Sequence, residues 1–491
     1  MAHVAYGQGW EDHPSPVSSA ALVDLIAVED LEAGAAALQK IADENGGNRV
    51  FGSTGHNATV DYLVAELEAL DYYDVSTQAF VELFSGGSGS LTVDGTEYEA
   101  LILTYTPNGD ATGSLVAVDN LGCDEADFPP EVEGQIALIS RGTCTFAAKV
   151  LNAGAAGAAA AIVYNNVEGT LAGTLGGTDP GYVPVLGLTQ ADGEALLALA
   201  EAGDTEVEMS VNAVLENRTT FNVIAETKGG DHDNVIALGA HTDSVEQGPG
   251  INDNGSGSIG ILTVAKALTK FTTTNAVRFL WWSAEEFGLL GAEYYVSQLN
   301  QSESEIAKIR AYLNFDMIAS PNYGIFIYDG DGSGFNITGP PGSSEIEAGF
   351  EAFFTAAGSP YLPTAFDGRS DYGPFLENGI AAGGLFTGAE DIKSEEEAAL
   401  FGGEVDVAFD VNYHAAGDTI DNLNYDAFLL NTQAIADSVA TYATSLDAIP
   451  VRSAPERRRA AAAARAMMSK RSVKRHAHTH SAPCGQSKTE L

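Results

Sequence analysis

Between Thr219 and Leu446 the sequence alternates between short apolar runs, which are typical of strands, and longer segments with helical periodicity. The strand candidates are FNVIAET, NVIALGA, AVRFLWW, AYLNFDM, YGIFIY and IAAGGLF, and the helix candidates include SGSIGILTVAKALTKF and AFLLNTQAIADSVATYATSL. Strands that alternate with helices indicate βαβ units. The sequence therefore predicts an α/β fold, a three-layer sandwich with a mixed, mostly parallel sheet between helices.

Residues of the kinds that bind metal ions follow three of these strand candidates and also occur in two loops. The five candidate ligands are His241, Asp253, Glu286, Asp316 and His414. In open α/β sheets, ligands bind beyond the carboxyl ends of the strands, so we expect these side chains at one edge of the sheet. Two imidazoles and three carboxylates suit zinc, with cobalt or manganese as alternatives. The pattern predicts a metal-dependent hydrolase with two ions that share the carboxylate of Asp253.

Three further residues are candidates for the chemistry of this site. Glu285 precedes Glu286, and successive side chains leave an extended backbone in opposite directions, so one can bind a metal while the other acts as a general base. Asp243 is placed to accept the second N–H of His241 and fix its tautomer, or else it is a turn or N-cap residue. Tyr413 either offers an O–H to a developing oxyanion or is a packed aromatic residue.

Two residues are candidates for the substrate site. Arg369 is one of the few basic residues that precede the C-terminal tail, and it either binds a carboxylate of a ligand or makes a structural ion pair. Phe386 either lines a specificity pocket or belongs to the core.

Charge narrows the class of protein. The chain has 68 Asp and Glu against 23 Lys and Arg, a net charge of −45. Such a chain repels nucleic acid and anionic membrane surfaces, and it suits an acidic, salty or extracellular setting, or solubility alone. No apolar run reaches the roughly 20 residues that span a bilayer, and the N-terminus has no signal-peptide core. We expect no nucleic-acid partner, no membrane span and a monomer.

Changes in composition divide the chain into five parts. We predict a disordered N-terminus (1–17), a first part of the α/β domain (18–80), a mostly β insert (81–215), the second part of the α/β domain (216–448) and a basic, disordered tail (449–491). Within the first part, a helix is expected from Ser18 to Glu44. A second is expected over Thr59–Leu70, with Thr59 as its N-cap.

Cysteines and glycosylation sequons bear on the compartment. Cys123 and Cys144 lie in one stretch of the insert and either form a disulfide, which implies an oxidising compartment, or are two free thiols. The sequons begin at Asn57, Asn217, Asn254, Asn300 and Asn336. Asn254 lies inside the expected metal site, so we expect it to be unmodified. Together these features favour the secretory pathway and a glycoprotein.

Several motifs closely resemble those of the co-catalytic two-zinc aminopeptidases, peptidase family M28. They are GAHTDS, GPGINDNGSG, WWSAEEFGLLGAEYY, LNFDMI, YHAAGDTIDN and, near the N-terminus, NRVFGSTGHNATVDYL. The segment CDEADFPPEVEGQIALISRGTCTFAAKVLNAGAAGAAAAIVYNN is similar to a protease-associated domain. The combination is most similar to the fungal secreted leucine aminopeptidases and the yeast vacuolar aminopeptidase Y. The resemblance covers about Ser18 to Leu446.

The resemblance implies a zinc exopeptidase fold and two Zn²⁺ per chain. It places His241 and Asp316 on one zinc and Glu286 and His414 on the other, with Asp253 bridging them. The implied substrates are peptides with a free N-terminus, from which the enzyme removes apolar residues such as Leu. The implied location is secreted or vacuolar.

The resemblance also implies the remaining roles. Glu285 is expected to be the general base that acts on a metal-bridging water. Apart from the resemblance, we expect acidic groups of the site, including Glu285 and Asp316, to hold the free amine. Asp243 orients His241, and Tyr413 stabilises the tetrahedral intermediate. Further implied features are substrate contacts at Arg369 and Phe386, a Cys123–Cys144 disulfide, and a cis peptide bond after Asp253.

Two other functions remain open from the sequence. A carboxypeptidase or a glutaminyl cyclase could use the same scaffold, with Arg369 binding a substrate carboxylate in the former. A binding protein that has lost catalysis is the alternative from another class.

Overall fold

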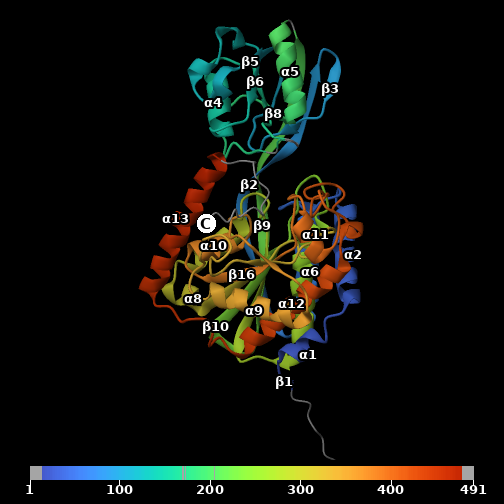
Figure 1. Ribbon diagram of the computed structural model, residues 1–491, viewed down its shortest axis with the longest axis vertical. Coiled ribbons are helices and arrows are strands. Elements are labelled where there is room, and N and C mark those ends of the chain that lie inside the picture. The colour runs from blue at the N-terminus through green and yellow to red at the C-terminus, as the bar shows by residue number, and fades with distance from the viewer. Residues whose placement is uncertain (1–13, 168–170, 172, 204, 478–491) are drawn as a thin grey trace, which may run out of the picture. The chain divides into compact units, whose positions relative to one another are not determined.

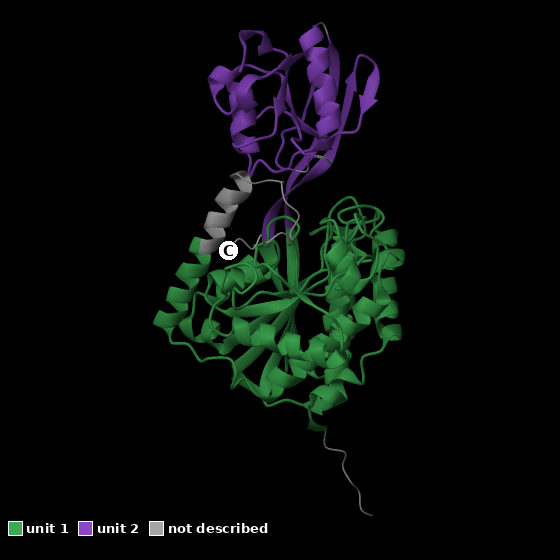
Figure 2. Ribbon diagram, viewed as in Figure 1, with its two compact units in different colours: residues 1–80, 219–468, 483–491 green, residues 81–218, 469–482 purple. Residues whose placement is uncertain are grey.

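The computed structural model describes residues 14–167, 171, 173–203 and 205–477, which form two compact units (Figures 1 and 2). The first unit includes the described residues up to 80 and residues 219–468, and the second includes residues 81–218. The predicted insert, 81–215, therefore falls inside the second unit. Strands β2 (Tyr73–Val93) and β9 (Glu206–Thr227) contribute residues to both.

A mixed sheet forms the centre of the first unit, in the order β15-β14-β16-β13-β10-β12-β9. Besides β9, its strands are β10 (Asp231–His241), β12 (Asn275–Trp282), β13 (Ile309–Phe315), β14 (Phe326–Tyr328), β15 (Leu362–Thr364) and β16 (Ala381–Phe386). The central strands β12, β10, β13 and β16 are mutually parallel, whereas β9 is antiparallel to β12 and β14 to β16. This confirms the predicted α/β fold with a mostly parallel sheet.

Helices cover both faces of this sheet (Figure 1). One face packs on α6 (Gly257–Leu268), α9 (Ser343–Ala357) and α12 (Tyr425–Thr444), with α1 (Ser19–Val23), α2 (Val28–Glu44) and α3 (Thr54–Glu68) in the same core. The other face packs on α7 (Leu290–Leu299), α8 (Glu303–Lys308) and α10 (Tyr372–Glu377). Adjacent residues Trp281 and Trp282 enter opposite cores. Burial on both faces explains why these strands read as continuous apolar runs.

The N-cap predicted for the second helix is wrong. Helix α3 begins at Thr54, and the side chain of its N-cap Ser53 accepts a hydrogen bond from the backbone N–H of His56. Thr59 lies inside the helix, where its hydroxyl donates to the Gly55 carbonyl. Glycine is uncommon inside helices, so Gly55 led to a predicted start that is too late. A Cβ at this position would lie 2.2 Å from the Asn48 carbonyl oxygen, so the packing requires glycine.

The second unit contains a further set of strands and two cores. Its strands are β5 (Gly109–Ala117), β6 (Ile136–Ser140), β7 (Ala160–Tyr164), β8 (Val185–Leu188) and β4 (Leu101–Ile102), and β2 forms a hairpin with β3 (Thr96–Tyr98). Strands β5 to β8 are parallel neighbours in that order. The helices are α4 (Phe146–Ala155) and α5 (Gln190–Ala202).

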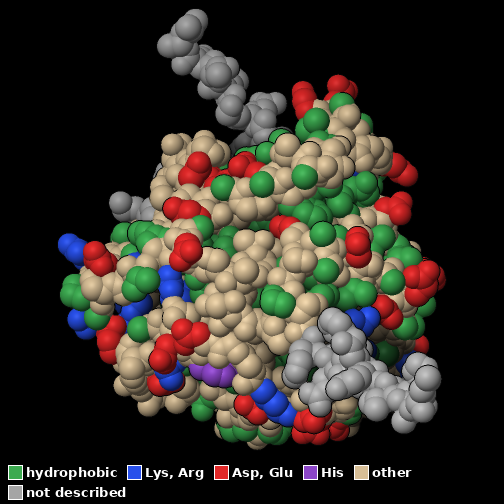
Figure 3. All heavy atoms as spheres, turned by 90° about the horizontal axis from the view of Figure 1, so that it is seen from below, with side chains coloured by type: hydrophobic (Ala, Val, Ile, Leu, Met, Phe, Trp, Pro, Cys, Tyr) green, Lys and Arg blue, Asp and Glu red, His purple; other side chains and the backbone are tan. Residues whose placement is uncertain are grey.

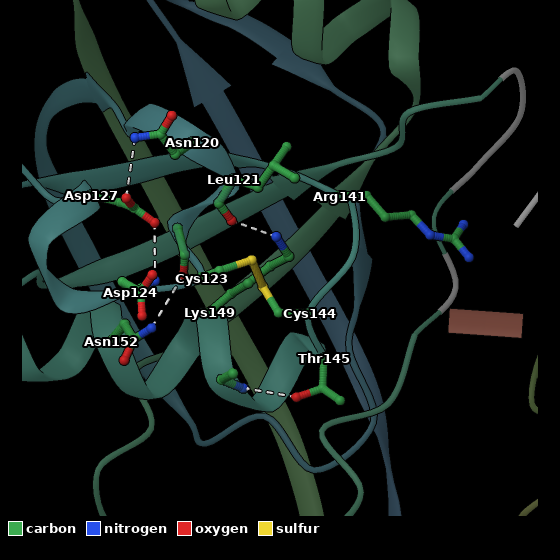
Figure 4. Close-up of a disulfide and its surroundings, with 12 residues drawn as sticks. Asn120, Leu121, Cys123, Asp124, Asp127, Arg141, Cys144, Thr145, Lys149 and Asn152 are labelled. Atoms are coloured by element: carbon green, nitrogen blue, oxygen red, sulfur yellow. Dashed lines mark hydrogen bonds between the residues drawn. A yellow bond between two sulfur atoms is a disulfide. The ribbon is translucent and has the colours of Figure 1, made fainter. Parts of the chain in front are cut away.

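A disulfide joins Cys123 to Cys144 in the second unit, as predicted (Figure 4). The loop before α4 is thereby tied to the short helical turn that follows β5. Nearby, the buried Lys149 donates hydrogen bonds to the carbonyls of Leu121 and Ser140. The disulfide and the lysine therefore hold the same pair of segments together.

The structure of the described ends differs from the disorder predicted for them. Residues 1–13 lie outside the described part, but Ser15–Pro16 forms β1, which pairs with β11 (Phe271–Thr272). In the basic tail, α13 (Ala454–Ala477) is helical. Arg457 of this helix pairs with Glu303, and Ala461 and Ala464 are buried. Small alanine side chains allow close packing without the large apolar residues that usually mark a buried helix.

Charged side chains are distributed as the composition suggests. Acidic side chains are spread over the face drawn in Figure 3, and Lys and Arg are fewer. Each helix among the described residues is too short or too polar to cross a membrane.

Removal of the disulfide should weaken the second unit. Cys123 and Cys144 are 21 positions apart, and a bridge that closes a loop of this size typically contributes about 2–4 kcal/mol. We expect the variant with both cysteines changed to serine to unfold at a lower temperature in calorimetry. The wild-type protein with reductant should shift in the same way. An unchanged melting temperature in both samples would contradict this prediction.

Candidate active site

The predicted site residues meet at the carboxyl ends of the strands of the first unit. His241 is the last residue of β10, Asp316 directly follows β13, and Phe386 ends β16. A cavity lies at this edge of the sheet. Its lining includes Asp253, Glu285, Glu286, Asp316, Arg369, Phe386 and Tyr413. The parallel topology thus brings together residues that are far apart in the sequence.

The carboxylate of Asp253 lies between two imidazoles. Its Oδ1 is 3.2 Å from Nε2 of His241, and its Oδ2 is 3.2 Å from Nε2 of His414. Asp316 Oδ1 is 3.4 Å from His241 Nε2, and Glu286 Oε2 is 2.9 Å from His414 Nε2. The geometry therefore gives two neighbouring groups of possible metal donors, and Asp253 contacts the imidazole of each.

The electrostatics of this group suit a cation. Burial raises the pKa of Glu286, and Glu286 Oε1 and Asp316 Oδ1 are buried without a hydrogen-bond partner among the described residues. Burial alone would lower the pKa of His241, but the charges of Asp316 and Glu285 outweigh it and raise that pKa well above its usual value. Buried carboxylates of this density are costly unless positive charge neutralises them. The donor set, imidazole nitrogen and carboxylate oxygen, fits zinc.

Two side chains fix the loop that carries Asp253. Asp418 accepts hydrogen bonds from the backbone N–H groups of Asn252 and Asp253, at 2.7 and 3.0 Å. The side chain of Asn254 donates to the carbonyl of Phe315, the last residue of β13. The peptide bond between Asp253 and Asn254 is cis, as expected. Asp253 is therefore held from both sides.

Arg49, which was not predicted from the sequence, binds the backbone just before Asp253. Its guanidinium is fully buried and donates to the carbonyls of Thr242, Pro249 and Gly250. Burial lowers the pKa of Arg49 to about 10, so the group remains charged at neutral pH. The signal for Arg49 was its presence in the NRVFGSTGH motif of a chain that has few basic residues.

Asp243 contacts both His241 and the proposed base. Its main-chain oxygen is 3.2 Å from Nδ1 of His241, whereas its carboxylate Oδ1 is 3.6 Å away. The same Oδ1 accepts a hydrogen bond from the backbone N–H of Glu285 at 3.1 Å. Glu285 Oε2 lies 3.8 Å from His241 Nε2, and burial raises the pKa of Glu285 well above its usual value. Asp243 thus couples the position of Glu285 to that of His241.

Arg369 makes a structural ion pair, which was one of the two interpretations that the sequence left open. Its guanidinium binds Glu390 with Nη1–Oε1 and Nη2–Oε2 distances of 2.8 and 3.1 Å, and Nη2 also donates to the hydroxyl oxygen of Tyr413 at 3.1 Å. Arg369 and Phe386 both line the cavity.

Two residues next to Arg369 also belong to the site and were missed. Ser370 Oγ donates to Asp316 Oδ2 at 2.5 Å and accepts from Asn314 Nδ2 at 2.7 Å. Asp371 is buried, neither of its carboxylate oxygens has a partner among the described residues, and burial raises its pKa. Their position in RSDYGPF, adjacent to a predicted site residue, was the available signal.

Comparison with known proteins agrees with this geometry. Residues 222–439 match Peptidase family M28, and residues 111–196 match the PA domain. Probable leucine aminopeptidase 2 of Aspergillus fumigatus is 54% identical over 488 residues, which cover 98% of this chain and 95% of the relative. Leucine aminopeptidase 2 of Trichophyton rubrum is 53% identical over 446 residues, 90% of each chain.

Solved structures are similar over most of the chain. An aminopeptidase from Aneurinibacillus sp. strain AM-1 is 30% identical with a TM-score of 0.69, and the similarity covers 89% of this chain and 98% of that one. BSAP, a zinc aminopeptidase from Bacillus subtilis, is 25% identical with a TM-score of 0.64, covering 88% and 97%. Together with the sequence matches, these similarities establish that the chain is a metallo-aminopeptidase that belongs to peptidase family M28 and carries an inserted PA domain.

Proposed function

We propose that this aminopeptidase binds two zinc ions and releases apolar N-terminal residues, such as Leu, from peptides. The observation that carries the proposal is the carboxylate of Asp253, which lies 3.2 Å from each of two imidazoles and offers one oxygen to each. His241 and Asp316 would hold one ion, and Glu286 and His414 the other.

The side chains of the cavity have distinct parts in the proposed reaction. When bound, zinc polarises the substrate carbonyl and makes its water a better nucleophile. Glu285 takes a proton from the attacking water and passes it to the leaving amine. Tyr413 donates its O–H to the oxygen of the carbonyl as negative charge develops there. Glu285 and Asp316 hold the free amine of the substrate.

The cavity also offers apolar surface for a side chain. Phe386, Met317 and Tyr328 line it together with the acidic groups. This combination supports a substrate whose N-terminal residue is apolar and whose ammonium group lies among carboxylates. Arg369 binds Glu390 with both of its terminal nitrogens, which disfavours a role in binding a carboxypeptidase substrate.

A secreted or vacuolar location is part of the proposal. The disulfide supports an oxidising compartment. Four of the five sequon asparagines are exposed, which supports glycosylation there, whereas Asn254 is buried.

Substrate end and metal dependence can be tested together. The purified protein should cleave leucine p-nitroanilide and leave N-acetyl-leucine p-nitroanilide intact, because the site must hold a free amine. A chelator should abolish the cleavage, and added zinc should restore it. Metal analysis of the active sample should give two zinc ions per chain. Equal cleavage of the acetylated compound would contradict the proposal.

Replacement of the proposed base should separate chemistry from metal binding. We expect Glu285→Ala to lower kcat by about 10²–10⁴-fold, the usual contribution of a general base, while the zinc content stays that of the wild type. The matched control is Glu66→Ala, because Glu66 pairs with Lys266 on the surface of the first unit. Near wild-type activity in Glu285→Ala would exclude Glu285 as the base.

A further inference from the structure

Glu390 has no assigned role, although it anchors a residue of the cavity. It lies four positions beyond Phe386, in the loop that follows β16. Its two carboxylate oxygens bind the two terminal nitrogens of Arg369, at 2.8 and 3.1 Å. Such bidentate pairs fix the orientation of a guanidinium group as well as its position.

The guanidinium that Glu390 fixes contacts Tyr413. Arg369 Nη2 donates to the Tyr413 hydroxyl oxygen at 3.1 Å, and the ring of Tyr413 stacks on the ring of His414 with centroids 3.8 Å apart. A phenol oxygen carries one hydrogen and accepts through its lone pairs. Because Arg369 occupies an accepting position, the O–H of Tyr413 is left to donate to another group.

The charge states favour this arrangement. Although burial opposes it, the charge of Arg369 holds the pKa of Glu390 below its usual range, so Glu390 is a carboxylate at neutral pH. The chain of contacts therefore runs from the Glu390 carboxylate through the Arg369 guanidinium to the Tyr413 hydroxyl.

We propose that Glu390 is a positioning residue for the aminopeptidase reaction, which holds Arg369 so that Arg369 directs the O–H of Tyr413 toward the substrate carbonyl. The inference rests on the proposed function, in which Tyr413 stabilises the developing oxyanion. A hydrogen bond from a cation to the phenol oxygen also strengthens the phenol as a donor. Glu390 acts on the transition state through Tyr413, without a contact to the substrate.

Substitution of Glu390 should leave the fold intact. The side chains of Arg369 and Glu390 are 38% and 48% exposed, and ion pairs this accessible contribute little to stability. Glu66 provides a matched control, because it pairs with Lys266 at 2.5 Å and the two side chains are 37% and 39% exposed. A loss of activity in Glu390→Gln but not in Glu66→Gln would therefore report on position and not on surface charge.

A double-mutant cycle on leucine p-nitroanilide tests the inference. This substrate has no carboxylate, so any part that Arg369 takes in binding a peptide carboxylate does not enter. We expect Glu390→Gln to lower kcat about tenfold and Tyr413→Phe to lower it about 10²-fold, in the range found for the loss of one oxyanion donor. KM should change less than about twofold, and zinc content and melting temperature should match the wild type. Glu390→Asp, which keeps the charge, should fall between Glu390→Gln and the wild type.

Non-additivity is the decisive readout. If Glu390 acts through Tyr413, Glu390→Gln should cause no further loss in the Tyr413→Phe background. A full tenfold loss in that background, or wild-type kcat in Glu390→Gln alone, would overturn the inference. Failure of the proposed function would look different, because the wild-type protein would then not cleave leucine p-nitroanilide.

Discussion

Buried negative charge at the ends of parallel strands is the constraint around which the first unit is built. The carboxylates of Asp253, Glu286 and Asp316 converge in a space where burial penalises charge. The fold offsets their repulsion with two imidazoles and with the buried guanidinium of Arg49, whose hydrogen bonds go to main-chain carbonyls. Arg49 thus donates its hydrogen bonds to the backbone, while its positive charge interacts with the carboxylates of Asp253 and Glu286.

The convergence of the candidate site residues at one edge of the sheet could be predicted, whereas the residues that support them could not. His241 and Asp316 end or directly follow apolar strands, and a parallel sheet brings such residues to one edge whatever the loops do. Support depends on contacts between distant segments. Arg49 reaches the carbonyl of Gly250, 201 positions away, and no local pattern around either residue encodes that contact. Asp243 does lie beside His241, as expected. The atom closest to the His241 ring is the main-chain oxygen of Asp243, however, and not its carboxylate.

The two helices that were predicted wrongly, α3 and α13, both pack through small residues. Gly55 suggested a loop, but it lies inside helix α3. Glycine is needed there because the Asn48 carbonyl oxygen leaves no room for a side chain. The alanines of α13 suggested a disordered, low-complexity segment, but Ala461 and Ala464 are buried within the first unit. Composition and periodicity detect large apolar side chains, so segments that pack through their backbone escape both. The strands of the sheet were predicted correctly because they carry large apolar side chains. Trp281 and Trp282, for example, are buried in opposite cores.

The position of Asn254 makes the assembly of the site depend on whether this loop folds before or after the chain is glycosylated. Its side-chain nitrogen donates to the Phe315 carbonyl, and its side-chain oxygen accepts from the backbone N–H groups of Gly257 and Met317. The same nitrogen is the acceptor atom of an Asn-Gly-Ser sequon, and a glycan would attach there. Folding and glycosylation at this position therefore exclude each other. In a chain exposed to the glycosylation machinery, the rate at which this loop is buried decides what fraction of molecules can assemble the site.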